Sequence, residues 1–288
     1  MNTDLHVKKR SHPKSEKDKT PTTWLNDKVE ENDKNQYEEM DLTLPQRKTS
    51  NEFVDYTFDY LKDDQKALTA VVMKKVKEFM TINDLGSFVP LRMTVMGAGG
   101  SGKSVVINTV VTLMRKMFGK NRVAMVAAPT GTAAFNVGGE TMHHLTLSAP
   151  RSSDYRPHQL RSNNKKRKKL IKKFKHLLLL AIDERSLIGL RDIGTTSTMI
   201  AETIYGGGPF PNKEFGGLPI LLMFGDDYQL PSIKPGAFAC LGPPKDTRLM
   251  YMRGRQIMLK CAGDTFELQG SKRIMSNKLN DKHIIECI

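Results

Sequence analysis

The chain has 288 residues and a formal net charge of +14, and its three cysteines, Cys240, Cys261 and Cys287, form no CxxC pair. We expect neither a disulfide framework nor a cysteine zinc site, and neither a membrane span nor a signal peptide, because no run approaches about eighteen apolar residues and Met1–Arg10 has no apolar core. A soluble intracellular protein without a membrane partner is therefore predicted, and its basic character favours nucleic acid as the polyanion that it binds.

The first fifty residues differ in composition from the rest. Residues 1–50 hold ten Lys or Arg and ten Asp or Glu, with one Trp and no sustained apolar period. A segment of this kind buries too little apolar surface to fold, so we predict a disordered charged tail over 1–50. The whole surplus of positive charge then lies in residues 51–288, which we predict to form one folded domain.

The folded part is predicted to alternate helices and strands. A first amphipathic helix is indicated by apolar residues at helical spacing: Leu61, Leu68, Val72, Val76 and Phe79. Four short apolar runs follow: Leu91–Met96, Val123–Ala128, Leu177–Ile182 and Pro219–Phe224. Their continuous apolar character suits strands that are covered on both faces, and the segments between them are long enough for crossover helices. We therefore predict an α/β fold with a mostly parallel central sheet.

A phosphate-binding motif follows the first predicted strand. Residues 97–104 read GAGGSGKS and fit GxxxxGK[ST] between the strand LRMTVM and an apolar helix. Backbone N–H groups can turn toward phosphates at its glycines, Gly97, Gly99, Gly100 and Gly102. Lys103 is predicted to reach the β- and γ-phosphates and Ser104 to bind Mg²⁺. The motif predicts a P-loop NTPase fold that binds ATP and Mg²⁺.

Acidic and amide residues follow the third and fourth predicted strands. The run LLLLAI ends in Asp183 and Glu184, and PILLMF is followed by GDDYQLP, which contains Gln229. The carboxyl ends of parallel strands meet at one edge of a sheet, so we expect these groups beside the P-loop. Asp183 would hold Mg²⁺, Glu184 would position or deprotonate the attacking water, and Gln229 would sense the γ-phosphate.

A strongly basic segment lies between the second and third predicted strands. Arg161–His176 reads RSNNKKRKKLIKKFKH and holds nine Lys or Arg and no acid. One interpretation is a solvated, partly helical connector or a nuclear import signal. The other is a contact with the phosphate backbone of nucleic acid. Both interpretations stay open on the sequence alone.

Several motifs together resemble one known family, over roughly residues 58–280. Ala128–Leu145 (APTGTAAFNVGGETMHHL), Asp183–Ser186 (DERS) and Gly225–Pro231 (GDDYQLP) look like motifs Ia, II and III of PIF-type, RecD-like superfamily 1B DNA helicases. Residues 61–65 (LKDDQ) and 268–273 (LQGSKR) are similar to the family's Q motif and motif IV. The resemblance implies a RecA-like domain that binds ATP·Mg²⁺, grips single-stranded DNA and belongs to a 5′-to-3′ unwinding motor.

The resemblance also implies roles for individual residues. Gln65 would contact adenine, and Arg273 would contact the charge that develops during phosphoryl transfer. The implied DNA contacts are Thr130, Gly131, Thr141 and His143. Hydroxyl and N–H donors at the start of a helix can bind phosphate oxygens, which makes such binding independent of base sequence.

Three positions depart from the family pattern. The family usually has a β-branched residue at Arg185, a second proline at Ser232 and a glutamine at Ile274. Arg185 beside the acidic pair could alter metal binding, and Ile274 weakens the assignment of Arg273. The sequence stops at Ile288 before any second RecA-like domain, so we expect a partner chain to supply one if the motor is complete.

The leading hypothesis is the first motor domain of a 5′-to-3′ DNA helicase that acts in DNA repair, recombination or telomere maintenance. One rival is a truncated, catalytically weak ATP- and DNA-binding module without unwinding activity. The other is an unrelated P-loop kinase or transporter ATPase, against which motif Ia and GDDYQLP argue. Lys8-Lys9-Arg10 and Lys165–Lys169 favour the nucleus as the compartment, with the mitochondrion as the alternative.

Overall fold

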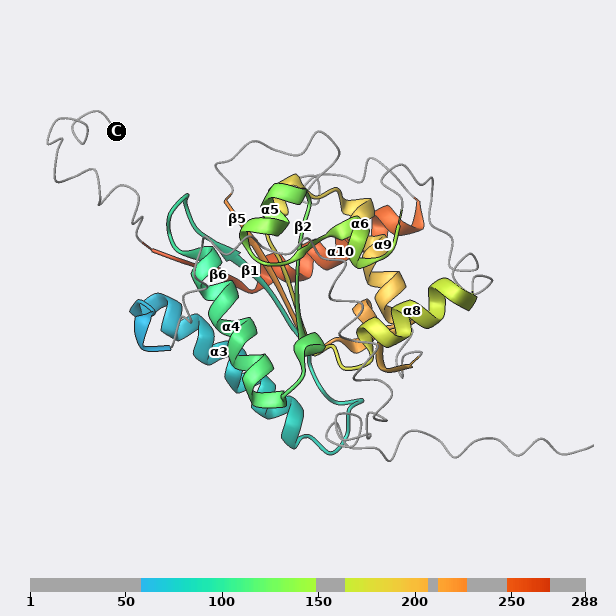
Figure 1. The fold of residues 1–288 in the computed structure, drawn as a ribbon, viewed down its shortest axis with the longest axis horizontal. Coiled ribbons are helices and arrows are strands. Elements are labelled where there is room, and N and C mark those ends of the chain that lie inside the picture. The colour runs from blue at the N-terminus through green and yellow to red at the C-terminus, as the bar shows by residue number, and fades with distance from the viewer. Residues whose placement is uncertain (1–57, 149–163, 207–211, 227–247, 270–288) are drawn as a thin grey trace, which may run out of the picture.

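A six-stranded sheet organises the part of the chain that the computed structural model describes, residues 58–148, 164–206, 212–226 and 248–269 (Figure 1). Its strands run parallel in the order β3-β2-β4-β5-β1-β6. The prediction of an α/β fold with a mostly parallel sheet is confirmed. The tail predicted over 1–50 lies outside the described residues, and so do Gln229 and Arg273.

The four central strands come from the four apolar runs. They are β1 (Leu91–Met96), β2 (Ala124–Ala128), β4 (Leu179–Ile182) and β5 (Ile220–Gly225). Every residue of β2, β4 and β5 is buried, because helices cover both faces of the sheet. The edge strands β3 (Glu140–Thr141) and β6 (Thr265–Glu267) were not predicted, since two or three residues are too few to show an apolar pattern.

Helices cover the sheet in two layers (Figure 1). On one face of the sheet, α3 (Asp63–Thr81) and α4 (Lys103–Phe118) pack against the strands and form one apolar core. On the other face, α9 (Leu190–Ala201) and α10 (Leu249–Gly263) form a second core. The helix predicted from Leu61 to Phe79 is α3, which begins at Asp63, so Leu61 lies just before it; the apolar residues of the pattern are buried as expected.

The remaining helical elements are shorter. They are α5 (Gly131–Asn136), α6 (Met142–Leu145), α8 (Asn164–Phe174) and the 3-10 turns η2 (Phe58–Tyr60), η3 (Asn121–Val123), η4 (Arg185–Leu187), η5 (Ile204–Gly206) and η6 (Glu214–Gly217). Among the described residues, no helix combines the length and the apolar character needed to cross a bilayer.

The crossing of α9 and α10 depends on a glycine in each helix. A Cβ added to Gly194 would collide with the carbonyl oxygen of Met250, and one added to Gly254 would collide with the carbonyl oxygen of Leu190. Each obstacle is backbone and cannot rotate away. The two helices therefore touch through their main chains, and any larger residue at the crossing would force them apart.

Gly254→Ala is expected to lower the free energy of unfolding by about 1–3 kcal/mol or more, the usual cost of overpacking a core. Chemical denaturation measures the change. Gly263→Ala, on the same helix, is the matched control, because nothing lies within 4 Å of a Cβ at that position. Alanine favours the helix there, so the control should unfold at the same denaturant concentration as the parent or at a slightly higher one. Equal unfolding midpoints for the two variants would contradict the close crossing.

Candidate functional site

The phosphate-binding loop lies between β1 and α4. Gly100 and Gly102 have φ angles of 87° and 93°, a left-handed conformation that glycine adopts without strain. Gly102 is also the N-cap of α4, so the first N–H groups of the helix face the loop. A Cβ at Gly99 would meet nothing within 4 Å, so the loop is open at that residue. This geometry suits an anion held by backbone N–H groups.

Lys103 is held by the loop itself. Its Nζ atom donates to the carbonyl oxygen of Gly97 at 2.5 Å and to that of Ala98 at 3.3 Å. An ammonium group has three N–H donors, so these carbonyls use two of them. Because the lysine already lies at the loop, phosphate oxygens bound there would compete with these carbonyls for its N–H groups.

Gln65 fixes the loop to α3. Its Nε2 donates to the carbonyl oxygen of Ser101 at 3.0 Å, and its Oε1 accepts from the backbone N–H of Lys62 at 3.1 Å. The side chain is buried, and a Cβ at Gly102 would collide with it. Sequence reasoning missed this positioning role, since no local pattern shows which loop a glutamine will reach. The implied contact of Gln65 with adenine stays a prediction.

The acidic pair lies two strands away from the loop. The strand β5 separates β4, which ends before Asp183, from β1, which ends at the loop. The backbone N–H of Asp183 continues the sheet by donating to the carbonyl oxygen of Ala127 at 2.8 Å. Because β4, β5 and β1 run parallel, Asp183 and the loop lie at the same edge of the sheet, and the Lys103 ammonium lowers the pKa of Asp183. The expected meeting of motif and acidic pair at one sheet edge is observed.

The carboxyl group of Asp183 has a raised pKa. Its pKa is raised from 3.8 to about 6, chiefly by burial; the hydrogen bond from the Glu184 N–H lowers it, the charge on Glu184 raises it, and Lys103 lowers it, all within that net value. Its Oδ1 is buried and has no hydrogen-bond partner among the described residues. A hard cation such as Mg²⁺ fits this atom, and the hydroxyl of Ser104 on the first turn of α4 is the second oxygen donor that the motif offers.

Asp183→Asn is expected to raise the melting temperature of the nucleotide-free protein at about pH 8 and to raise it by only about half as much at about pH 5. The folded-state pKa of about 6 exceeds the ordinary 3.8, so ionisation destabilises the fold. This penalty is absent below pH 3.8, grows up to about pH 6 and is complete above it. Thermal unfolding at both pH values measures the difference. Asp264→Asn, at the exposed end of α10, is the control; the same shifts in both variants would contradict the assignment.

Glu184 has an unusual backbone. Its φ and ψ are 51° and 48°, a left-handed conformation in which a residue with a Cβ is strained by about 1–3 kcal/mol. The turn η4 that follows holds it there, because the N–H of Leu187 donates to its carbonyl oxygen at 3.0 Å. Its Oε2 is buried and lacks a hydrogen-bond partner among the described residues. The arrangement gives Glu184 a conformation different from that of its neighbour Asp183.

Arg185, one of the departures from the family pattern, packs on the neighbouring strand. It is buried, and its Cγ and Cδ would lie 2.6 Å and 3.2 Å from a Cβ at Gly225. The glycine at the end of β5 therefore makes room for the arginine stem. The predicted effect of Arg185 on metal binding remains a prediction.

Two of the residues implied to bind DNA start neighbouring helices. Thr130 caps α5 by accepting from the N–H of Ala133, and Thr141 caps α6 by accepting from the N–H of His144, each at 3.2 Å. Thr141 pairs with Ala128 in the sheet, so both threonines lie at the carboxyl edge. A hydroxyl that accepts a hydrogen bond can still donate its own proton, and a phosphate oxygen can receive it.

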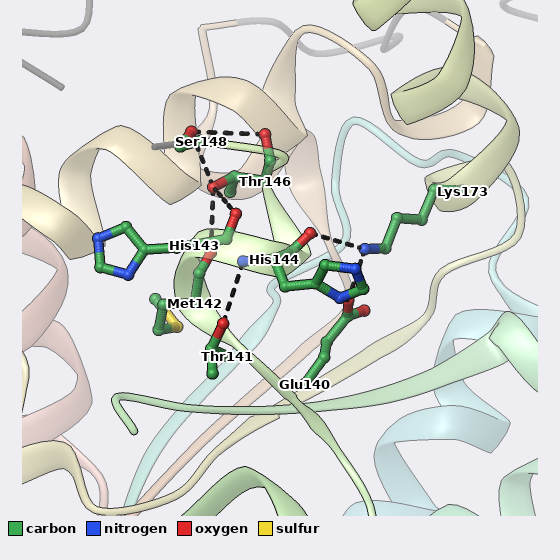
Figure 2. Close-up of polar contacts among 8 residues, drawn as sticks. All are labelled: Glu140, Thr141, Met142, His143, His144, Thr146, Ser148 and Lys173. Carbon is green, nitrogen blue, oxygen red and sulfur yellow. Dashed lines mark hydrogen bonds and ion pairs between the residues drawn. The ribbon is translucent and has the colours of Figure 1, made fainter. Parts of the chain in front are cut away.

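Gly131 and His143 complete the group that the resemblance implies. Gly131 is exposed at the start of α5, with nothing within 4 Å of a Cβ position. His143 is half-buried, and its ring points away from Glu140 and Lys173 (Figure 2). All four residues lie along the segment that follows β2, and their contacts with DNA remain predictions.

The described part of the basic segment begins at residue 164, and Asn164–Phe174 form the helix α8. It is not uniformly solvated, because Leu170, Phe174 and His176 are buried. Lys173 forms an ion pair with Glu140, with 2.7 Å between Nζ and Oε2. Sequence reasoning placed Lys173 in an undivided basic run, since an acid 33 residues away gives no local indication of the pairing.

These features define a class. A glycine-rich loop after β1, an acidic pair after β4 and a strand between them in a parallel sheet describe a P-loop NTPase domain of the RecA-like type. The PIF1-like helicase family model matches residues 60–240, more than half of the chain. The chain therefore belongs to the PIF1-like helicase family, and the resemblance drawn from its motifs is confirmed.

Individual relatives agree with the family. The chain is 26% identical to the ATP-dependent DNA helicase RRM3 of Saccharomyces cerevisiae, over 59% of this chain and 20% of that protein. It is 31% identical to the ATP-dependent DNA helicase PIF5 of Trypanosoma brucei brucei, over 49% of this chain and 14% of that protein. The crystal structure of Pif1 helicase from Candida albicans superposes with a TM-score of 0.53 at 21% identity, covering 76% of this chain and 42% of that one. The matched part is less than half of each relative.

Proposed function

We propose that this chain is the first RecA-like motor domain of a 5′-to-3′ DNA helicase and that it binds and hydrolyses ATP. One observation carries the proposal: the glycine loop with Lys103 follows β1 and the pair Asp183 and Glu184 follows β4, so both lie at the carboxyl edge of one parallel sheet. A cation for the phosphates and a carboxylate pair for metal and water therefore share one edge. The relatives RRM3 and PIF5 are ATP-dependent DNA helicases, which supports the same activity.

The residues of the site divide the work of hydrolysis. The N–H groups of the loop and Lys103 would hold the β- and γ-phosphates, and Ser104 with Asp183 would hold Mg²⁺. When bound, Mg²⁺ neutralises charge on the phosphate oxygens. Glu184 would take a proton from the attacking water. The water oxygen bonds to the γ-phosphorus while the bond between the γ-phosphorus and the β,γ-bridging oxygen breaks, which yields ADP and phosphate. Gln229 and Arg273 keep their predicted roles as γ-phosphate sensor and charge-stabilising arginine.

Single-stranded DNA is the proposed partner of the carboxyl edge beside this site. The Thr130 and Thr141 hydroxyls, the backbone at Gly131 and the ring of His143 would contact phosphates, which gives binding without base specificity. A second RecA-like domain, in a partner chain or elsewhere in a longer protein, would complete the motor. The resemblance favours a role of this protein in DNA repair, recombination or telomere maintenance. The basic segments favour the nucleus as its compartment, with the mitochondrion as the alternative.

Stimulation of ATP hydrolysis by single-stranded DNA tests this function. We expect the 288-residue chain to bind ATP·Mg²⁺ and single-stranded DNA and its turnover to rise when DNA is added. ATP and DNA binding without turnover would favour the alternative, a binding module that does not unwind. ATP hydrolysis with no DNA binding at all would contradict the helicase assignment and return the domain to another class of P-loop enzyme.

A further inference from the structure

The basic helix α8 has two different faces. Leu170 and Phe174 have no exposed surface and pack in the core shared with α9 and α10. On the other side, Lys165, Lys168 and Lys169 are exposed. Residues three and four apart lie on one side of a helix, so these three lysines, which we call the outer lysines, form a single positive surface. Within Asn164–Phe174 no acid offsets their charge.

Lys173 joins this helix to β3 and α6. Its Nζ donates to Oε2 of Glu140 at 2.7 Å and to the carbonyl oxygen of His144 at 3.2 Å (Figure 2). The same carboxylate oxygen lies 2.7 Å from Nδ1 of His144. The side chains of Lys173 and Glu140 are only 12% and 14% exposed, so their charges interact mainly with each other and little with solvent.

The contacts of Lys173 with Glu140 and His144 fix the position of α8 relative to the residues implied to bind DNA. Glu140 immediately precedes Thr141, the N-cap of α6, and His144 lies within α6. The contacts of Lys173 therefore join α8 to the short segment that carries Thr141 and His143. Lys169 precedes Lys173 by about one turn of α8 and Lys165 by about two turns, so the outer lysines lie within roughly 12 Å of Lys173 along the helix axis.

We propose that the outer lysines bind phosphates of single-stranded DNA next to those held at α5 and α6, whereas Lys173 joins α8 to α6 and makes no phosphate contact. The inference rests on the proposed function. Three ammonium groups on one helical surface are complementary to a polyanion, and lysine serves as a point charge that needs no fixed geometry. The surface would extend the length of strand held without reading its bases.

The test compares two triple variants with the same change in charge. The first replaces the outer lysines by glutamine, and the second replaces Lys66, Lys74 and Lys77 of α3, which covers the other layer of the fold. Glutamine is a good helix former, so both variants should fold, and circular dichroism checks this. Affinity for a single strand of mixed sequence is measured over a series of salt concentrations for both variants and the parent.

We expect the outer-lysine variant to have a flatter plot of log K against log salt, by about 0.7 for each phosphate that the parent neutralises with an outer lysine, and by about 2 for all three lysines. The α3 variant should keep the slope of the parent. The inference is overturned if the outer-lysine slope equals that of the parent, if both variants flatten equally, or if the weakening is confined to duplex DNA. Failure of the parent itself to bind single strands would instead overturn the proposed function and this inference with it.

Discussion

Lys103→Ala is expected to lower the rate of ATP turnover by about 10²- to 10³-fold, the usual effect of removing one donor to a charge that develops in the transition state. The Lys103 ammonium lies at the loop, 2.5 Å from the carbonyl oxygen of Gly97, where phosphates would replace that carbonyl. Alanine supplies no charge there, so ATP affinity should fall as well. Steady-state turnover and equilibrium nucleotide binding measure the two effects.

The matched control for Lys103 is on the same helix. Lys116→Ala removes an identical charge from the last turn of α4, about 20 Å along the axis at 1.5 Å per residue. Its turnover and ATP affinity should equal those of the parent. Parent-like turnover in Lys103→Ala would show that residues 97–104 do not bind the phosphates, or that a contaminating ATPase was measured.

Glu184→Gln is expected to keep ATP bound while turnover falls by about 10²- to 10⁴-fold, the contribution of a positioned general base. The amide has the same shape but cannot take a proton from water. Glutamine also carries a Cβ, so the left-handed backbone at φ 51° is no more strained than in the parent. Nucleotide binding and single-turnover hydrolysis, measured on the same preparation, separate the two effects.

The control here removes a carboxylate outside the site. Glu78→Gln, whose side chain is 45% exposed and pairs with Lys75 on α3, should leave both binding and turnover unchanged. Loss of nucleotide binding in Glu184→Gln would indicate that Glu184 holds the structure of the loop. The base would then have to be sought at another residue.

The contrast between Asp183 and Glu184 shows how neighbours acquire different roles. Asp183 follows a buried strand, and burial raises its pKa to about 6 while the nearby Lys103 opposes the shift. Glu184 begins the turn η4 in a left-handed conformation. Their order in the sequence suggested a metal ligand followed by a base, and the backbone geometry is compatible with that division of labour.

The sequence by itself determined the elements whose cause is local. The four central strands follow from apolar runs, α3 follows from helical spacing, and the loop at 97–104 follows from glycines between a strand and a helix. Each of these depends on residues within a few positions of one another. The ordered motifs were specific enough to indicate the family that the comparison confirmed.

Only the tertiary structure decided which distant residues meet. Gln65 contacts Ser101 across 36 positions, and Lys173 contacts Glu140 across 33. The sheet order, which inserts β5 between the loop strand and the acidic strand, likewise depends on how the crossovers pack. Such contacts depend on the packing of whole layers. For that reason the basic run in the sequence became, in the fold, one largely buried, ion-paired lysine and one exposed basic surface.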